Sequence, residues 1–335
     1  MSTLVINQDQ VERLLTMRDC VEVMERILRD LAAGECDLPL RSILWLPGRV
    51  GALGLMPSYW QSAGIVGLKA VTFFPGNEGS ELDSHQGAVL LFEAERGRLL
   101  AMVDATSITA IRTAAVSAVA TKVLARPDAA TLAIIGSGVQ AAAHLEAMCI
   151  ARPISSVRVF GKSPKRTRAF ADRHGKRCNL PIAAVQSVQQ AVSGADIVCT
   201  TTSSAVPVLR GRWLASGMHI NAVGSSVATA RELDTEAVRR CRLFVDRRES
   251  AISEAGDFVL AKKEGVVDDD HILGEIGELL AGQAHGRRSP DDVTLFKSVG
   301  LAVEDLAAAW HVYGKAREST EAASIEFGGR RREAH

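Results

Sequence analysis

Residues 131–148, TLAIIGSGVQAAAHLEAM, decide the fold: a short apolar run leads into two glycines and then into an alanine-rich segment. The apolar run predicts a buried strand, and the segment after the glycines predicts a helix. The connecting residues, Gly136, Ser137, Gly138, Val139, Gln140 and Ala141, fit the G-x-G-x-x-A pattern in its required strand-turn-helix context. Such a turn lets a pyrophosphate approach the backbone at the helix N-terminus. A glycine turn without a ligand is the alternative.

From this motif onward, strand and helix patterns alternate. Helical stretches separate five short apolar runs: TLAIIG, SVRVFG, ADIVCTTT, HINAVGS and RLFVD. This alternation is typical of a parallel sheet covered by helices, and it argues against a turn without a ligand. The expected fold is α/β, with a Rossmann-type dinucleotide-binding domain over residues 127–300.

The residues after SVRVF indicate which dinucleotide binds. NAD sites carry an acidic residue here, at the end of the second strand, to bind the ribose hydroxyls. This chain instead has the sequence GKSPKR, in which Lys162, Ser163 and Arg166 suit a 2′-phosphate. A basic, solvated helix start is the alternative, but cations at a helix N-terminus oppose the helix dipole and favour a nearby anion. We therefore expect NADPH, with NADH as the weaker cofactor.

The flanking segments predict a second, discontinuous α+β domain. Residues 16–34 have the spacing of an amphipathic helix, residues 41–104 contain short apolar runs typical of an antiparallel or mixed sheet, and a long helix ends before Arg126-Pro127. The segment from Leu295 onward supplies one more strand and then a helix, which we expect to return to this domain. The expected bounds are 1–126 with 301–325, followed by a disordered tail at 326–335.

Composition excludes several classes of protein. Lys plus Arg and Asp plus Glu both total 39, so no net charge attracts nucleic acid or an anionic membrane. Aromatic residues make up only 4%, which is low for single-stranded nucleic-acid binding. The six cysteines form no C-x-x-C pair, so no metal site or disulfide framework is expected. The start of the chain lacks a signal-peptide pattern, and we expect a soluble, cytoplasmic protein.

Three cations stand in apolar surroundings. Arg112 is the only charged residue between Asp104 and Lys122, and a buried guanidinium requires an anionic partner. That partner could be a protein carboxylate or a substrate carboxylate. Lys69, within GIVGLKAVTFF, could lie on a solvated strand face or in a closed pocket with an altered pKa. Arg41 follows Pro39 and Leu40, where an exposed loop arginine is the simplest interpretation.

Five motifs in order give the chain a family resemblance: SHQGAVLLFE, MVDATSITAIRTAAVSAVATK, IIGSGVQA, HINAVGSS and FKSVGLAVED. Together they resemble the ornithine cyclodeaminase/mu-crystallin family over nearly the whole chain. The resemblance implies a homodimer in which the discontinuous domain binds substrate and forms the interface. It also implies that Arg41, Lys69 and Arg112 surround a substrate carboxylate.

Ser226 departs from the pattern of the family's cyclodeaminases, which have an aspartate at this position. A serine cannot replace it as a base near neutral pH. Ketimine reductases of the family resemble this chain here, so the resemblance implies NADPH-dependent reduction of Δ1-pyrroline-2-carboxylate or Δ1-piperideine-2-carboxylate to L-proline or L-pipecolate. Lys69, Arg112 and Ser226 would form the catalytic group. The alternatives are an alanine dehydrogenase, an ornithine cyclodeaminase and an NADPH-dependent hormone-binding protein.

Further cofactor contacts are expected from residues at strand ends and helix starts. These are Thr113, Val223, Gly224 and Ser298, in addition to the glycine turn and the basic cluster. His85 and Gln86 are expected to close the cofactor site from the other domain. The segment SEAGD, with Glu254, Gly256 and Asp257, also resembles a family motif; we expect these residues to cap a helix.

Overall fold

The computed structural model describes residues 2–77, 80–319 and 322–329, and it separates into two compact units. Unit 1 contains Met1–Arg112 and Leu301–His335, and unit 2 contains Thr113–Gly300. Of the expected tail, Glu326 is the last residue of a strand, and residues 330–335 lie outside the described part of the chain. The roles expected for the two domains stay predictions.

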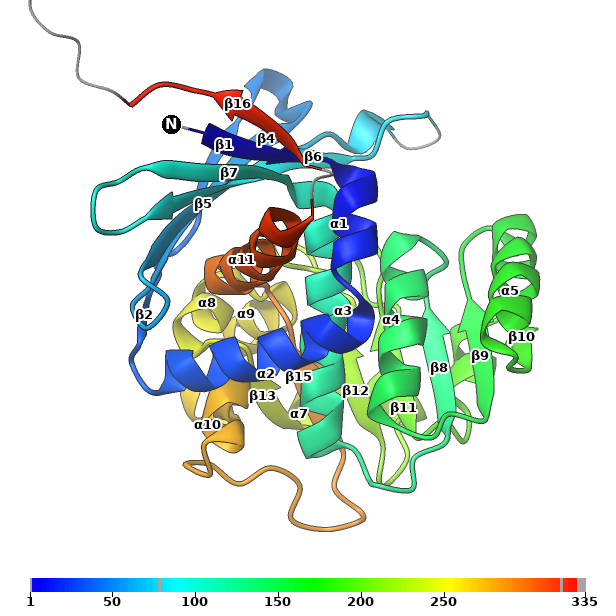
Figure 1. Ribbon diagram of the computed structural model, residues 1–335. Helices are drawn as coiled ribbons and strands as arrows, with labels where there is room; N and C mark the ends of the chain where they lie inside the picture. The colour runs from blue at the N-terminus through cyan, green and yellow to red at the C-terminus, as the bar shows by residue number, and fades with distance from the viewer. Residues whose placement is uncertain (1, 78–79, 320–321, 330–335) are drawn as a thin grey trace, which may run out of the picture. The chain divides into compact units, whose positions relative to one another are not determined.

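Unit 1 is built on a mixed sheet with strand order β16-β1-β7-β6-β5-β4-β2 and with β3 beside β4 (Figure 1). The pair β1-β7 is parallel and the other pairs are antiparallel, so the expected antiparallel or mixed sheet is confirmed. The strands are β1 (Ser2–Ile6), β2 (Cys36–Asp37), β3 (Ser42–Trp45), β4 (Ala52–Trp60), β5 (Ile65–Phe73), β6 (His85–Glu93), β7 (Leu99–Asp104) and β16 (Ala323–Glu326).

Helices cover one face of this sheet. They are α1 (Gln8–Leu14), α2 (Met17–Ala32) and α11 (Ala302–Glu318). The amphipathic pattern of α2 buries Val21, Met24 and Leu28, as expected. Helix α11 contacts β4, β5 and β6, and it approaches β5 so closely that a Cβ on Gly67 would lie 2.6 Å from Leu306 Cδ1. The C-terminal helix therefore completes the core of the N-terminal sheet, as the discontinuous domain requires.

Unit 2 contains an eight-stranded sheet in the order β10-β9-β8-β11-β12-β15-β13-β14, with every described pair parallel. The order reverses between β8 and β11, and open α/β sheets bind ligands beyond the carboxyl ends of the strands at such a point. The expected Rossmann fold is confirmed. Its strands are β8 (Thr131–Ile135), β9 (Ser156–Phe160), β10 (Ile182–Ala184), β11 (Ile197–Thr200), β12 (His219–Ala222), β13 (Arg242–Val245), β14 (Ile272–Glu275) and β15 (Thr294–Lys297).

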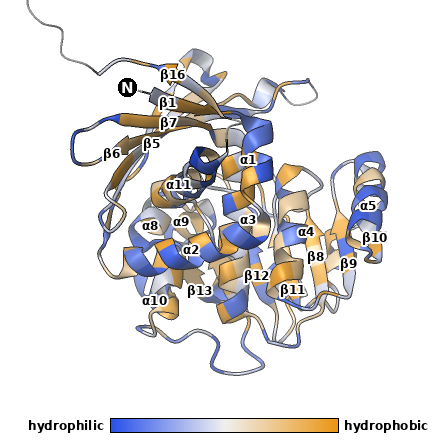
Figure 2. Cartoon of the chain, viewed as in Figure 1, coloured by the Kyte–Doolittle hydropathy of each residue, from blue (hydrophilic) through white to orange (hydrophobic). Residues whose placement is uncertain are grey.

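The helices of unit 2 connect these strands. They are α4 (Val139–Ala151), α5 (Pro164–Cys178), α6 (Val188–Val192), α7 (Thr235–Arg240), α8 (Arg248–Glu254), α9 (Gly256–Lys263) and α10 (Ile276–Leu280). Helix α5 is largely hydrophilic, whereas the strands are mostly hydrophobic (Figure 2). This contrast is typical of a parallel sheet that its helices cover.

The two units meet in sequence within α3 (Ala105–Leu124), after Arg112, whereas Pro127 was the expected boundary. Hydrogen bonds explain the difference. The hydroxyl of Ser117 lies 2.9 Å from His144 Nε2 on α4, and the Thr121 hydroxyl accepts from Asn221 Nδ2 on β12 at 2.9 Å. The C-terminal half of α3 is thus part of the Rossmann core. By length and composition α3 could cross a membrane, but 72% of its apolar window is buried in the protein.

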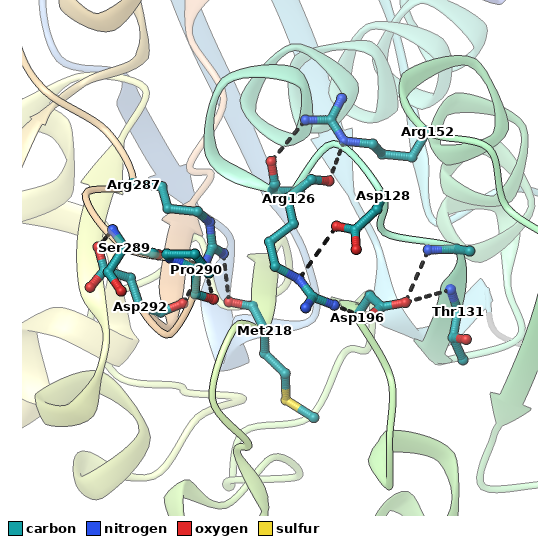
Figure 3. Close-up of polar contacts among 12 residues, drawn as sticks. Arg126, Asp128, Thr131, Arg152, Asp196, Met218, Arg287, Ser289, Pro290 and Asp292 are labelled. Atoms are coloured by element: carbon teal, nitrogen blue, oxygen red, sulfur yellow. Dashed lines mark hydrogen bonds and ion pairs between the residues drawn. The ribbon is translucent and has the colours of Figure 1, made fainter.

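Arginines cap the C-terminal end of α3 at the amino edge of the parallel sheet (Figure 3). Arg152 donates to the carbonyls of Lys122, Ala125 and Arg126 at 2.8–3.0 Å. Arg287 Nε donates to the Leu124 carbonyl at 2.8 Å. The last carbonyls of a helix have no partners within the helix and carry its negative pole, so guanidinium groups satisfy both needs. This group of cations therefore has a structural role.

Candidate functional site

The glycine turn joins β8 to α4 at the carboxyl edge of the Rossmann sheet. Gly136 has φ +127°, and a Cβ there would lie 2.6 Å from Thr201 Oγ1, so only glycine fits this position. Gly138 is the exposed N-cap of α4 and provides no side-chain cap for the first turn of that helix. An uncapped helix N-terminus beside an exposed glycine suits a pyrophosphate, so these residues fit a dinucleotide.

The basic cluster lies next to this turn. A Cβ on Gly161, the residue after β9, would lie 2.7 Å from Ser137 Oγ, which shows how closely the two loops approach. Lys162 and Arg166 are exposed, and Ser163 caps α5 by accepting a hydrogen bond from Arg166 N at 3.4 Å. The residues expected to hold a 2′-phosphate and those expected to hold the pyrophosphate thus share one edge of unit 2.

Other residues expected to contact the cofactor are divided between the units. Val223 N donates to Thr200 O and Ser298 N donates to Ala222 O, both at 3.0 Å, so Val223, Gly224 and Ser298 lie at the same carboxyl edge. Thr113 is buried in α3. His85 and Gln86 are exposed at the start of β6 in unit 1. For these two residues, cofactor contact stays a prediction.

Lys69 lies on the covered face of the sheet of unit 1. It pairs in register with Met56 and Val89, and its side chain is 3% exposed. Its Nζ donates to Asp305 Oδ1 on α11 at 2.9 Å. Of the two environments open for Lys69 on sequence grounds, the structure shows the closed one.

Arg112 is buried and shares the Asp305 carboxylate with Lys69. Its Nε donates to Asp305 Oδ1 at 3.0 Å and its Nη1 donates to Glu304 Oε2 at 2.8 Å. The guanidinium therefore has protein partners, which was the simpler of the two interpretations. Glu304 and Asp305 were not identified as site residues from the sequence. They are two adjacent acids in a mostly apolar helix, and a buried acid requires a cationic partner just as a buried arginine requires an anionic one.

The electrostatics of this buried group alter the behaviour of Lys69. Its pKa is lowered to about 8, chiefly by burial and also by the charges of Arg112 and Arg41, while Asp305 acts to raise it. For Asp305, burial acts to raise the pKa, but Arg112 and Lys69 outweigh it and the net pKa is lowered. Arg41, which is half-buried, is thus close enough to affect Lys69. The structure brings the three expected cations together within unit 1.

Ser226 lies in unit 2, half-buried in the loop after β12. Its predecessor Ser225 has φ +61°, a left-handed conformation that is uncommon outside glycine. The structure shows no catalytic partner for Ser226 among the described residues, and its role stays a prediction.

In the described part of the chain, no group of three or more His, Cys, Asp or Glu residues could hold a metal ion.

The helix-capping role expected for SEAGD is wrong. Ala255 is the N-cap of α9 and makes no side-chain cap, while Glu254 ends α8. Asp257 is buried and accepts hydrogen bonds from the backbone of Glu232 at 2.7 Å and of Leu233 at 2.8 Å. Its carboxylate binds amides of a distant loop, so it is not available to its own helix.

Comparisons with known proteins agree with this arrangement. The model of the ornithine cyclodeaminase/mu-crystallin family matches residues 1–320. The chain is 41% identical over 277 residues to ketimine reductase mu-crystallin from Mus musculus, which covers 82% of this chain and 84% of the mouse protein.

Two solved structures are similar over almost the full length. Thermococcus litoralis Δ1-pyrroline-2-carboxylate reductase, in complex with NADH and L-proline, matches with a TM-score of 0.92 and 39% identity, covering 94% of this chain and 98% of that one. An archaeal alanine dehydrogenase dimer with bound NAD matches with a TM-score of 0.92 and 33% identity, covering 98% and 100%. The chain belongs to the ornithine cyclodeaminase/mu-crystallin family.

Proposed function

We propose that this chain reduces small cyclic imines that carry a carboxylate, such as Δ1-pyrroline-2-carboxylate or Δ1-piperideine-2-carboxylate, with NADPH as the hydride donor. The chain is an NAD(P)H-dependent oxidoreductase acting on C–N bonds, as its similarity to a ketimine reductase and a pyrroline-carboxylate reductase indicates. The observation that carries the substrate assignment is the buried group of cations around Lys69.

The charge of this group suits a carboxylate ligand. Lys69, Arg112 and Arg41 provide three positive charges, and Glu304 and Asp305 provide two negative ones. A substrate carboxylate would accept charge-assisted hydrogen bonds from these ammonium and guanidinium groups. Because Glu304 and Asp305 fix the guanidinium of Arg112, the substrate would meet it in a fixed orientation.

Lys69 is suited to supply the proton. With a pKa of about 8 it is mostly protonated at neutral pH, yet it releases the proton more readily than an ordinary lysine. A protonated imine is the better hydride acceptor, so Lys69 would keep the substrate in that form. The bound dinucleotide supplies the hydride, and the protein contributes orientation, electrostatics and exclusion of water. Ser226 would at most donate a hydrogen bond.

The preference for NADPH is proposed from the chain itself. The two similar structures contain NADH and NAD. In this chain the basic cluster Lys162, Ser163 and Arg166 lies beside the glycine turn, where a 2′-phosphate would lie.

All six cysteines are free, which supports a reducing compartment such as the cytoplasm.

NADPH oxidation, measured with each of the two imines, tests the function. Pyruvate plus ammonium and NADH as cofactor are the comparison reactions. We expect rapid turnover of a cyclic imine with NADPH. Turnover only with pyruvate and ammonium would instead identify an alanine dehydrogenase, the alternative that the similar archaeal structure supports. Ammonia release from ornithine would identify a cyclodeaminase, and hormone binding without turnover would identify a binding protein.

We also propose that the chain forms a homodimer through the exposed apolar residues of β3 and of the turn that follows it. Ile43, Leu44 and Trp45 on β3 are 39%, 62% and 42% exposed, and Val50 is 61% exposed. An apolar patch of this kind is typical of an interaction surface. The similar archaeal structure is a dimer.

Leu44→Asp should convert this dimer to a monomer, because the substitution buries a charge in the apolar interface. Sedimentation velocity at micromolar protein concentration measures the change. Val206→Asp is the matched control, since Val206 is 67% exposed in unit 2. A Leu44→Asp variant that still sediments as a dimer would place the interface elsewhere.

A further inference from the structure

A closed ring of buried polar contacts surrounds Gly224 at the carboxyl edge of the Rossmann sheet. Gly224 N donates to Glu232 Oε2 at 2.8 Å, and Glu232 N donates to Asp257 Oδ1 at 2.7 Å. Asp257 Oδ2 forms an ion pair with Lys297 Nζ at 3.0 Å, and Lys297 Nζ donates to the carbonyl of Gly224. Both backbone polar groups of one glycine are therefore fixed by buried side chains.

Glu232 also fixes the neighbouring loop after β11. Its Oε1 accepts from the backbone N and the hydroxyl of Thr202, at 2.6 and 2.7 Å, and its Oε2 accepts from the Thr200 hydroxyl at 2.7 Å. One fully buried carboxylate thus joins the loops that follow two adjacent strands. The loops are so close that a Cβ on Gly224 would lie 2.3 Å from the Thr202 carbonyl oxygen.

Backbone strain beside the ring indicates that this geometry is imposed. Ser225 follows Gly224 directly and has φ +61°. Residues in such conformations persist where surrounding structure holds them, and they cluster at functional sites. Burial and Asp257 raise the pKa of Glu232, against the opposing effects of Lys297 and the two threonines. A buried ionic group of this kind stabilises a fold poorly compared with apolar packing, so its position at this edge points to another role.

We propose that Glu232, supported by Asp257 and Lys297, is a positioning residue that holds the loops after β11 and β12 against the nicotinamide half of the cofactor. A dinucleotide lies across the point where strand order reverses, between β8 and β11. The basic cluster follows β9, on one side of the glycine turn, and marks the adenosine half. The loops fixed by Glu232 lie on the other side. This inference rests on the dinucleotide binding proposed above.

A carboxylate is required because each of its oxygens meets a backbone N–H, from Thr202 on one side and from Gly224 on the other. Glutamine has one oxygen, so its amide would face one of these N–H groups donor to donor. Glu232→Gln should therefore free one loop while leaving the glycine turn and the basic cluster intact.

The experiment compares two ligands. Glu232→Gln should lower kcat with NADPH and weaken NADPH binding by at least roughly 10-fold, the effect of losing a hydrogen bond to a charged group. Binding of 2′,5′-ADP, which lacks the nicotinamide half, should stay within about twofold of native, because its contacts lie outside the changed loops. A general structural defect would weaken both ligands.

Asp196→Asn is the matched control. Its carboxylate also joins backbone N–H groups of a neighbouring segment, accepting from Ala130 N at 3.0 Å and Thr131 N at 2.9 Å, but at the amino edge of the sheet. We expect this variant to lose stability without changing the ratio of NADPH to 2′,5′-ADP affinity. If Glu232→Gln does not fold, Thr200→Val removes only one hydroxyl donor and should shift the same ratio less.

The outcomes are distinct. Equal weakening of both ligands, or no change in either, would overturn the positioning role of Glu232. A native protein that binds neither ligand would overturn the dinucleotide function instead. A native protein that binds NADPH but reduces no imine would contradict the proposed substrate, while the two-ligand comparison would still test Glu232.

Discussion

Replacing Lys69 with methionine should lower kcat for the cyclic imine by roughly 10³-fold, the range in which positioned proton donors contribute. Methionine is close to lysine in size and fills the buried site, but it carries no proton. NADPH affinity should be unchanged, because the expected cofactor contacts that follow the strands of the Rossmann sheet belong to unit 2. Steady-state kinetics combined with NADPH titration separates the two effects.

Lys315→Met provides the control. Lys315 belongs to the same unit and also pairs with an aspartate, Asp19, at 2.6 Å, but it is 39% exposed. Surface ion pairs of this kind contribute little, so turnover should persist. If Lys69→Met turned over imines at the native rate, the assigned proton transfer would be wrong.

The pH profile of the native protein gives an independent check. Because the pKa of Lys69 is lowered from 10.5 to about 8, the protonated form is lost as the pH rises through about 8, and kcat/KM should fall above that value. Stability changes in the opposite direction. Between these two pKa values the unfolded chain binds more protons than the folded one, so this group makes the fold more stable as pH rises. Titration of Lys69 would therefore lower activity in this window without destabilising the fold.

Reversing the charge of Lys162 should have the second largest effect. Lys162→Asp is expected to raise the NADPH Kd by roughly 100-fold, because it removes a charge-assisted contact and adds repulsion against the 2′-phosphate. NADH lacks this phosphate and should bind within a few-fold of native. Fluorescence titration with both cofactors measures the difference.

Arg173→Asp is the appropriate control for this substitution. Arg173 is exposed on α5 like Lys162's neighbours, but it lies further along the helix from the glycine turn. The same change in net charge there should alter both affinities only slightly at physiological salt. Equal weakening of NADPH and NADH by Lys162→Asp would contradict a phosphate contact at this position.

Sequence patterns predicted the Rossmann unit well because its signals are local. A strand, a glycine turn and a helix lie within residues 131–148, and Gly136 has the conformation and close contact that its place in the motif implies. The discontinuous domain was also anticipated, since a helical pattern follows the last strand. The division within α3 was not anticipated, because its cause lies in the hydrogen bonds that join Ser117 and Thr121 to residues far away in the sequence.

Partners far apart in sequence account for what was missed. Lys69 and Asp305 are separated by most of the chain, and periodicity does not pair them. Asp257 was assigned to its own helix because capping is the commonest local role of an aspartate before a helix. Its real partners, Glu232 and Lys297, lie on other elements, and no local pattern marks them.

The place of α11 in unit 1 has a consequence for biosynthesis. The strands that carry Lys69, and the first turns of α3 that carry Arg112, leave the ribosome long before Glu304 and Asp305 have been translated. Until then these two cations lack the carboxylates of α11, and the sheet face lacks its C-terminal helix. The Rossmann segment is complete earlier and has its own core, so it is free to fold first. Nascent chains halted before residue 301 should consequently require chaperones for their N-terminal third, but not for their middle.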